Sequence, residues 1–171
     1  NYNNEITFHS PPVMTIHRKE NLQINKLDKI MNFCKNYGKE INFFLHHSTK
    51  AFMEKNNYKL PKNIKIKPPA KYHEMVDALS TCKFIISDSG GLMKTSPFFG
   101  KKCIVMRDEI EWVEVEELGY GIRLSKLQDP ISWVLNDKML PNRDKNFYMK
   151  DGKPSKIIID TIKKFIDGSK K

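Results

Sequence analysis

The stretch Phe84-Ile85-Ile86-Ser87-Asp88-Ser89-Gly90-Gly91 joins a short apolar run to a polar turn rich in small residues. The run over 84–86 is typical of a buried strand, and the residues after the turn, 92–99, are predicted to form a helix that ends at Gly100. A strand, a turn and a helix in this order form the repeating unit of a parallel sheet covered by helices. This stretch therefore predicts an α/β fold.

The same alternation of strand and helix continues in both directions along the chain. Further strands are predicted over 13–17, 41–45, 64–66, 103–106 and 121–124. Further helices are predicted over 21–37, 49–57, 72–82, 126–135 and 155–166. In the first of these helices Leu27, Ile30, Met31 and Cys34 recur at helical spacing and form one apolar face. The whole pattern predicts a Rossmann-like parallel sheet with helices on both faces.

The pattern also divides the 171 residues into one domain with two polar ends. We expect 1–12 to be a polar tail or interdomain linker, 13–166 to be the Rossmann-like domain and 167–171 to be a basic tail. Because the chain begins with Asn1 rather than with Met, we expect it to be part of a longer protein.

The net charge of +10, from 30 Lys and Arg against 20 Asp and Glu, favours an anionic partner. Nucleic-acid-binding proteins usually gather their cations on one stripe with interleaved aromatic residues. Here the lysines are scattered along the whole chain, so we expect no nucleic acid and no membrane partner. An anionic small molecule such as a nucleotide sugar suits the charge equally well.

The cysteine pattern indicates a reducing compartment. Cys34, Cys82 and Cys103 are far apart and lie among apolar residues, without the spacing of metal ligands, so we expect buried free thiols and no metal. No apolar run reaches the ~18 residues that a membrane span needs. A cytoplasmic location is therefore expected.

Polar and ionisable residues follow each predicted strand. His17 and Arg18 follow the first strand, His46 and His47 follow the second, and Arg107 follows the strand over 103–106. In parallel sheets ligands bind beyond the carboxyl ends of the strands. The strand exits are therefore the expected ligand site, although His17 can also be read as a residue that simply closes a strand.

The Ser89-Gly90-Gly91 turn is the candidate phosphate site. Small residues allow the backbone to approach a ligand closely, and the helix that follows offers unsatisfied N–H groups. The alternative is that Asp88 and Ser89 only cap the helix and that the glycines make a tight turn. The sequence leaves both interpretations open.

An acidic and aromatic group follows the strand over 103–106. Glu111 and Glu114 flank Trp112, which suits a grip on sugar or ribose hydroxyls beside a packing aromatic ring. A solvated acidic helix start explains the same residues equally well.

Three ordered motifs carry a resemblance to a known family. They are Thr15-Ile16-His17-Arg18-Lys19-Glu20-Asn21, Ser87-Asp88-Ser89-Gly90-Gly91 and Arg107-Asp108-Glu109-Ile110-Glu111-Trp112-Val113-Glu114. Together they resemble the non-hydrolysing UDP-N-acetylglucosamine 2-epimerase family, over its carboxyl-terminal, UDP-binding half. The Glu-Trp-Val-Glu variant, with Lys94 and Cys103, is more similar to the branch that acts on modified acetamido sugars.

The resemblance implies a glycosyltransferase-B-like enzyme of two domains, of which this chain is one half. Family members eliminate UDP and add it back with inversion at C2 of the sugar, in nucleotide-sugar and polysaccharide biosynthesis, without a cofactor. The resemblance implies His17 as a catalytic residue near the diphosphate. It implies UDP or phosphate binding by Arg18, Tyr72, Met75, Ser89, Gly90, Gly91 and Thr95, and sugar-binding or structural roles for Arg107, Glu111, Trp112 and Glu114.

Three residues depart from the family pattern. Met93 stands where the family usually has Gln, Thr95 aligns with the acidic residue that grips the ribose, and Ile110 replaces a usual Thr. A Thr hydroxyl cannot supply the charged, two-pronged grip of a carboxylate. The resemblance therefore predicts weakened nucleotide binding.

The family keeps its catalytic carboxylates in the amino-terminal half, which this chain does not match. We therefore expect this chain alone to be inactive and to be completed by that domain, in cis or in trans, with a homodimer also possible. A degenerate epimerase-like binding module without catalysis and a transferase domain of glycosyltransferase-B type are the alternatives.

Overall fold

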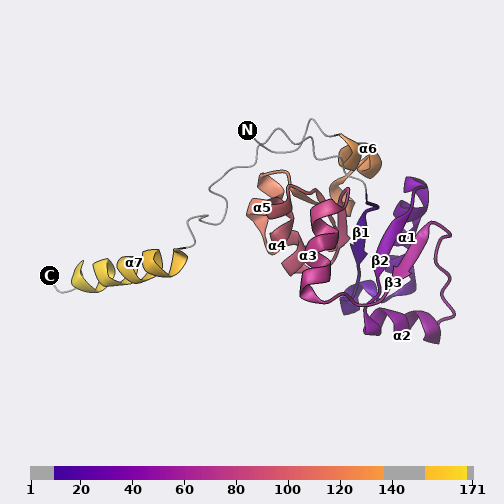
Figure 1. Ribbon diagram of the computed structural model, residues 1–171, viewed down its shortest axis with the longest axis horizontal. Helices are drawn as coiled ribbons and strands as arrows, with labels where there is room; N and C mark the ends of the chain where they lie inside the picture. The colour runs from indigo at the N-terminus through magenta and orange to yellow at the C-terminus, as the bar shows by residue number, and fades with distance from the viewer. Residues whose placement is uncertain (1–9, 137–152, 169–171) are drawn as a thin grey trace. The chain divides into compact units, whose positions relative to one another are not determined.

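The computed structural model describes residues 10–136 and 153–168, which belong to two separate units. The first unit contains a parallel sheet with the strand order β3-β2-β1-β4-β5-β6. Figure 1 labels β1, β2 and β3 of this sheet. Its strands are β1 (Val13–Thr15), β2 (Ile41–Phe44), β3 (Ile64–Lys67), β4 (Ile85–Ser87), β5 (Cys103–Val105) and β6 (Gly121–Arg123). All six predicted strands are confirmed, with ends that differ by one or two residues.

The strand order confirms the predicted Rossmann-like fold. From β1 the chain builds the sheet outward through β2 to β3, then returns to the other side of β1 and continues through β4 and β5 to β6. The exits of β1 and β4 are therefore neighbours at the point where the direction of building reverses. In open parallel sheets this is the place where ligands bind.

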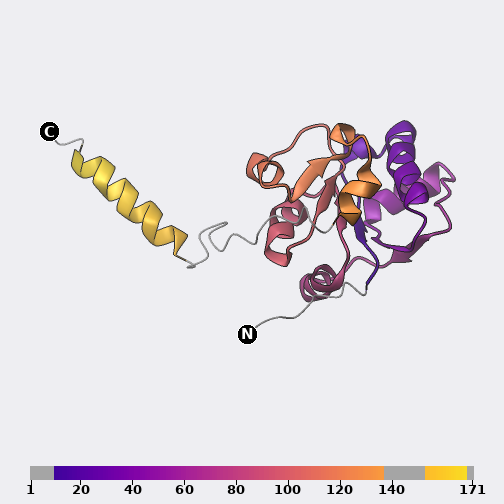
Figure 2. The same cartoon turned by 90° about the horizontal axis from the view of Figure 1, so that it is seen from above.

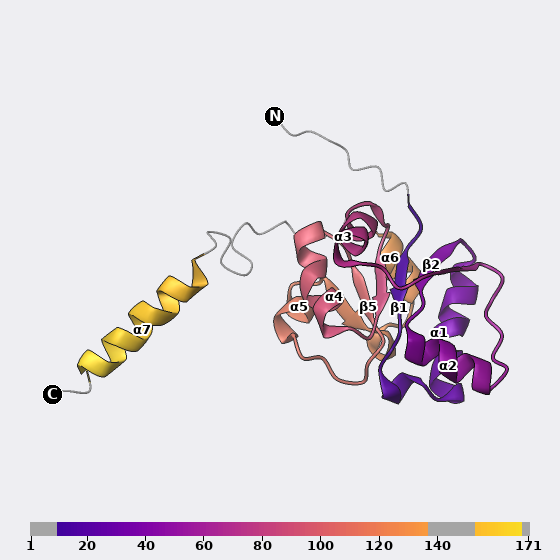
Figure 3. The same ribbon diagram turned by 60° about the horizontal axis from the view of Figure 1, so that its bottom comes forward.

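Helices cover both faces of the sheet. They are α1 (Ile24–Tyr37), α2 (His47–Lys55), α3 (Tyr72–Thr81), α4 (Gly90–Thr95), α5 (Val113–Glu117) and α6 (Pro130–Leu135). Single 3-10 turns form at η1 (Lys19–Asn21), η2 (Ser96–Phe99) and η3 (Leu124–Lys126). Seen along the sheet, α1 and α2 lie on one side of the strands and α3, α4 and α5 on the other (Figures 2 and 3).

Each face of the sheet has its own apolar packing, because successive side chains of a strand point to opposite sides. Met14, Ile86 and Ile104 belong to the main core with the buried faces of α1, α2 and α6. Their neighbours along the strands, such as Val13 and Ile85, are equally buried on the opposite face. Strands buried on both faces explain the continuous apolar runs in the sequence.

Local capping explains where the helices differ from prediction. The second predicted helix was expected to begin at Thr49, but α2 begins at His47 because the His46 side chain accepts a hydrogen bond from the Ser48 N–H. The predicted helix over 126–135 was too long. α6 begins only at Pro130, where Asp129 caps it by accepting from the Ser132 N–H at 3.0 Å.

The amino-terminal end of the first predicted helix was also wrong. Residues 19–21 form the η1 turn, and α1 begins at Ile24. Asn21 is buried, and its side chain joins the strand exits described below. At the other end, Gly38 adopts a positive φ of 72° and terminates α1 as predicted.

The second unit contains α7 (Pro154–Gly168), which confirms the helix predicted over 155–166. Of the two predicted polar ends, residues 1–9 and 169–171 lie outside the described residues, so the domain limits of 13–166 stay a prediction. The three cysteines are buried free thiols, as expected. No helix in the described ranges is long and apolar enough to span a membrane.

Candidate functional site

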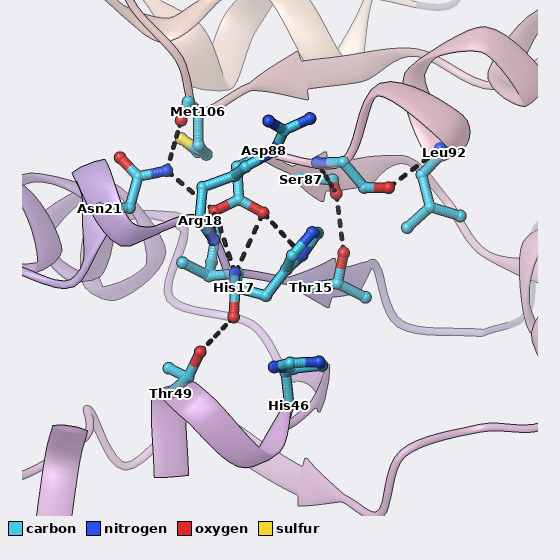
Figure 4. A network of polar contacts seen from close by, with 12 residues as sticks. Thr15, His17, Arg18, Asn21, His46, Thr49, Ser87, Asp88, Leu92 and Met106 are labelled. Atoms are coloured by element: carbon cyan, nitrogen blue, oxygen red, sulfur yellow. Dashed lines mark hydrogen bonds and ion pairs between the residues drawn. The ribbon is translucent and has the colours of Figure 1, made fainter. Parts of the chain in front are cut away.

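Asp88 joins the carboxyl ends of β1 and β4 (Figure 4). Its side chain is 0% exposed and accepts hydrogen bonds from the His17 N–H at 3.0 and 3.1 Å and from the Arg18 N–H at 2.8 Å. The ring of His17 lies against the same carboxylate, with Nδ1 3.1 Å from Oδ1. The segment after β1 is therefore folded around a side chain that follows β4.

Asn21 extends this link to the third exit, that of β5. Its side-chain NH₂ donates to Asp88 Oδ2 at 3.0 Å and to the Met106 carbonyl at 2.6 Å. Neither Asp88 nor Asn21 was predicted as a functional residue, since local sequence places them in a helix cap and in a helix. The available signal was the position of Asp88, a carboxylate directly after a buried strand.

The Ser89-Gly90-Gly91 turn begins α4, and Ser89 is confirmed as a helix cap. Its hydroxyl accepts from the Leu92 N–H at 3.5 Å. The absence of a side chain at Gly90 allows Glu111 to lie close to the turn, because a Cβ at Gly90 would be 2.5 Å from Glu111 Oε2. Gly91 is exposed, and a Cβ there would meet only the Ser89 hydroxyl, at 3.7 Å. Capping and ligand binding are thus compatible at this turn.

Glu111 lies at the centre of a group of arginines beside the turn. Its carboxylate is 2.8 Å from Arg107 Nη1 and 3.6 Å from Arg18 Nη2. The bond to Arg107 lowers the pKa of Glu111 from its ordinary value, so the side chain is charged at neutral pH. An anion that binds between Gly90 and Arg18 therefore competes with Glu111 for Arg18.

Trp112 closes one side of this group. The indole nitrogen would lie 3.6 Å from a Cβ at Gly90, and Lys94 Nζ lies 4.1 Å from the centre of the ring. This distance is typical of a cation–π contact. The predicted residues Arg18, Gly90, Arg107, Glu111 and Trp112 are thus brought together at one edge of the sheet.

Two further histidines lie beside His17. The rings of His17 and His46 are 5.4 Å apart between centroids, and those of His46 and His47 are 3.9 Å apart. Burial, followed by the neighbouring His47 and His17, lowers the pKa of His46 from its ordinary value. His46 is therefore neutral at neutral pH.

Four predicted residues lie outside the contacts described above. Tyr72 begins α3 and is 86% exposed, and Met75 follows within the same helix, half-buried. Glu114 is half-buried in α5. Thr95 ends α4, where its hydroxyl donates to backbone carbonyls of the same helix at 2.9 and 3.1 Å. Their proposed contacts with a nucleotide stay predictions.

Comparison with known proteins gives one consistent family. The sequence model described as UDP-N-acetylglucosamine 2-epimerase matches residues 1–163. UDP-2,3-diacetamido-2,3-dideoxy-D-glucuronate 2-epimerase of Pseudomonas aeruginosa is 31% identical over 121 residues, which cover 68% of this chain and 34% of that protein. UDP-N-acetylglucosamine 2-epimerase of Methanocaldococcus jannaschii is 30% identical over 139 residues, covering 74% of this chain and 38% of that protein.

Solved structures agree with the sequence matches. The crystal structure of the Methanocaldococcus jannaschii UDP-GlcNAc 2-epimerase in complex with UDP-GlcNAc and UDP superposes with a TM-score of 0.69 at 26% identity. The match covers 90% of this chain and 45% of that one. The chain thus spans less than half the length of these relatives, and its fold is that of one half of a glycosyltransferase-B-type architecture.

Proposed function

The chain belongs to the UDP-N-acetylglucosamine 2-epimerase family, and we propose that it is the UDP-binding half of a sugar-nucleotide 2-epimerase. The observation that carries this proposal is the convergence of His17, Arg18 and the Ser89-Gly90-Gly91 turn at the exits of β1 and β4. The crystal structure of the Methanocaldococcus jannaschii relative, in complex with UDP-GlcNAc and UDP, supports the same class of ligand.

In this proposal the diphosphate lies against the backbone of Gly90 and Gly91. Arg18 neutralises its charge, and a guanidinium suits phosphate oxygens because its donors form a planar fork. The charge of Arg18 becomes fully available when Glu111 is released from it. His17 lies next to Arg18, anchored on Asp88, and interacts with the reacting part of the ligand.

The proposed reaction is inversion at C2 through elimination and re-addition of UDP. It requires groups that remove and return the proton at C2. We assign these groups to an amino-terminal half, in cis or in trans, so this chain alone binds nucleotide without epimerising it. The match to the Pseudomonas aeruginosa relative favours a UDP-linked acetamido sugar as the substrate class.

A degenerate binding module is the second candidate, and Thr95 is the observation that favours it. The family resemblance puts an acidic, ribose-gripping residue at this position. Here the hydroxyl is engaged by carbonyls of its own helix. Weak but saturable nucleotide binding is compatible with both candidates, so epimerase activity of the full-length protein separates them.

Calorimetric titration of the chain with UDP and with UDP-N-acetylglucosamine tests the proposal. Saturable binding is expected, with a dissociation constant on the order of 0.1–1 mM. The combined change Ser89→Ala and Gly91→Asp should abolish it, because it places a carboxylate where the diphosphate approaches. The fold should survive, since Gly91 is exposed and a Cβ there has room.

Gly91→Ala is the matched control for that variant. Its Cβ adds bulk without charge, so a loss of binding confined to the Asp variant identifies electrostatic repulsion by an anion. Equal binding by the wild-type chain and the double variant would remove the phosphate assignment.

A further inference from the structure

We infer that Asp88 is a positioning residue that holds the His17 ring with its proton on Nδ1 and leaves Nε2 unprotonated on the opposite edge of the ring. The inference rests on the proposed function only for its consequence in catalysis. The state of the ring follows from the contacts of Asp88 alone.

The contacts of Asp88 come from groups that can only donate. Two of them are backbone N–H groups, of His17 and Arg18, and the third is the Asn21 NH₂. Oδ2 accepts from all three, at 3.0, 2.8 and 3.0 Å. A side chain at 0% exposure that is surrounded by donors is an acceptor, as an ionised carboxylate is.

The ring of His17 completes this set of donors. A neutral imidazole carries its proton on one nitrogen and a lone pair on the other. With Nδ1 only 3.1 Å from Oδ1, a lone pair on Nδ1 would face a lone pair of the carboxylate. A proton on Nδ1 converts this repulsion into an attraction between the ring N–H and the carboxylate. The ring is therefore held as the Nδ1–H tautomer.

The neighbouring His46 has different partners. Its Nδ1 lies 3.3 Å from the Ser48 N–H and 2.7 Å from the Ser48 hydroxyl, which can either donate to this nitrogen or accept from it. The two rings, with centroids 5.4 Å apart, therefore differ in what faces Nδ1: a carboxylate at His17 and a hydroxyl at His46.

This arrangement has a direct consequence for catalysis. A neutral ring with an unprotonated Nε2 can accept a proton from a hydroxyl group of the bound ligand, a different proton from the C2 proton assigned to the amino-terminal half, and Asp88 then stabilises the imidazolium that forms. His17 retains access for this step, since its side chain is 34% exposed while that of Asp88 is fully buried. Asp88 acts through His17 and does not itself need to touch the substrate.

The variant Asp88→Asn separates the tautomer from the fold of the loop. Three donors meet at Oδ2, so the Asn carbonyl oxygen takes that position and keeps their hydrogen bonds. The Asn NH₂ then takes the Oδ1 position, where it donates to His17 Nδ1; the His17 N–H loses its 3.1 Å contact there and keeps its 3.0 Å bond to the carbonyl oxygen. His17 Nδ1 must lose its proton, and the ring changes to the Nε2–H tautomer.

Correlation spectra of the ¹⁵N-labelled histidine rings, recorded at a pH where the rings are neutral, measure the tautomers directly. The signals of His17 are identified as those missing from His17→Gln. We expect Nδ1–H in the wild-type chain and Nε2–H in Asp88→Asn. In the full-length protein the same variant should lower kcat on the order of 10²- to 10⁴-fold with a smaller effect on KM.

Asn21→Ala is the control, because it removes a neighbour of Asp88 and keeps the Asp88–His17 pair. It should preserve the Nδ1–H tautomer. An Nε2–H ring in the wild-type chain, or an unchanged tautomer in a folded Asp88→Asn, would overturn the inference. If the Asn variant does not fold, the wild-type spectrum still decides. Failure to bind UDP would count against the proposed function and leave the tautomer result intact.

Discussion

Glu111 is the residue whose unliganded contacts bear most directly on anion binding. It lies against Gly90 and shares Arg18 with any phosphate that binds there. Replacing Glu111 by Gln removes the competing charge and keeps the size of the side chain. We expect Glu111→Gln to bind UDP roughly two- to fivefold more tightly in calorimetric titration. The gain is small because the Arg18–Glu111 ion pair that it removes is exposed to solvent.

Glu117→Gln is the matched control, because it removes the same charge from α5 at an exposed position outside the arginine group. It should leave UDP affinity unchanged. If Glu111→Gln weakens the binding of the UDP-sugar, Glu111 is a hydroxyl contact, as the sequence motif also allowed. The pair of variants thus decides between the two interpretations of the acidic motif.

Thr95 is the second residue where a single change tests the family resemblance. In the contacts described, the Thr95 hydroxyl donates only to carbonyls of its own helix, so its removal should change the stability of the chain little. Thr95→Glu should restore a charged acceptor for the ribose and tighten UDP binding by about 10- to 200-fold, as a charged hydrogen bond of ~1.5–3 kcal/mol gives. Calorimetry measures the gain.

Thr95→Gln separates charge from length in this experiment, since it has the reach of Glu without its charge. The gain should be much smaller in the Gln variant. No gain in either variant would mean that Thr95 does not face the ribose.

The packing of β6 against α4 and α5 depends on the absence of a side chain at Gly121. A Cβ there would lie 3.0 Å from Val115 Cγ1 and 3.6 Å from Met93 Cγ, both of which are buried. Gly121→Ala should therefore lower the free energy of unfolding by ~1–3 kcal/mol, as overpacked cores do. Urea denaturation measures this change.

Gly91→Ala is again the control, because its Cβ meets only the Ser89 hydroxyl at 3.7 Å. Its stability should equal or exceed that of the wild-type chain, since Ala favours a helix over Gly. A neutral effect of Gly121→Ala would show that Val115 can shift to make room.

Elements with strong local signals were predicted well. α1 ends at Gly38 as expected, because the apolar spacing and the glycine stop act within the segment itself. α6 was predicted too long, because the sequence over 126–129 gives no clear break before Asp129 and Pro130 set the first turn. Its last turn is fixed from a distant part of the chain, where Lys102 donates to the Trp133 and Asn136 carbonyls at 2.6 and 2.7 Å.

The whole sheet unit contains three thiols whose burial links its stability to alkaline pH. Burial raises the pKa of Cys34 to about 12 and that of Cys82 to about 11 from an ordinary value of 9.0. Burial also raises the pKa of Cys103. Above the ordinary value the unfolded chain loses thiol protons that the folded chain keeps, so stability is complete below that pH and falls as pH rises.

We therefore expect the free energy of unfolding to decrease between about pH 9 and about pH 11. The contribution of one thiol is about 1.4 kcal/mol per pH unit. Urea denaturation at several pH values measures the slope. Cys34→Ala should be less stable than the wild-type chain at neutral pH, because it leaves a cavity. Its free energy of unfolding should nevertheless decrease less steeply with pH. An unchanged slope would show that Cys34 titrates normally in the folded chain.

The sequence by itself determined the α/β class, the polar strand exits and the membership of Ser89, Gly90 and Gly91 in one turn, because periodicity and turn chemistry act between residues close in the chain. It also carried the family motifs. Only the tertiary structure decided which distant residues meet. Asp88 accepts from the His17 N–H, and Asn21 donates both to Asp88 and to the Met106 carbonyl. Glu111 lies against Gly90. These partners are separated by up to 85 positions in the chain, and the parallel pairing of β1, β4 and β5 brings their exits to one edge. Local sequence cannot encode which distant donors meet a buried carboxylate, since that choice is made by the strand order.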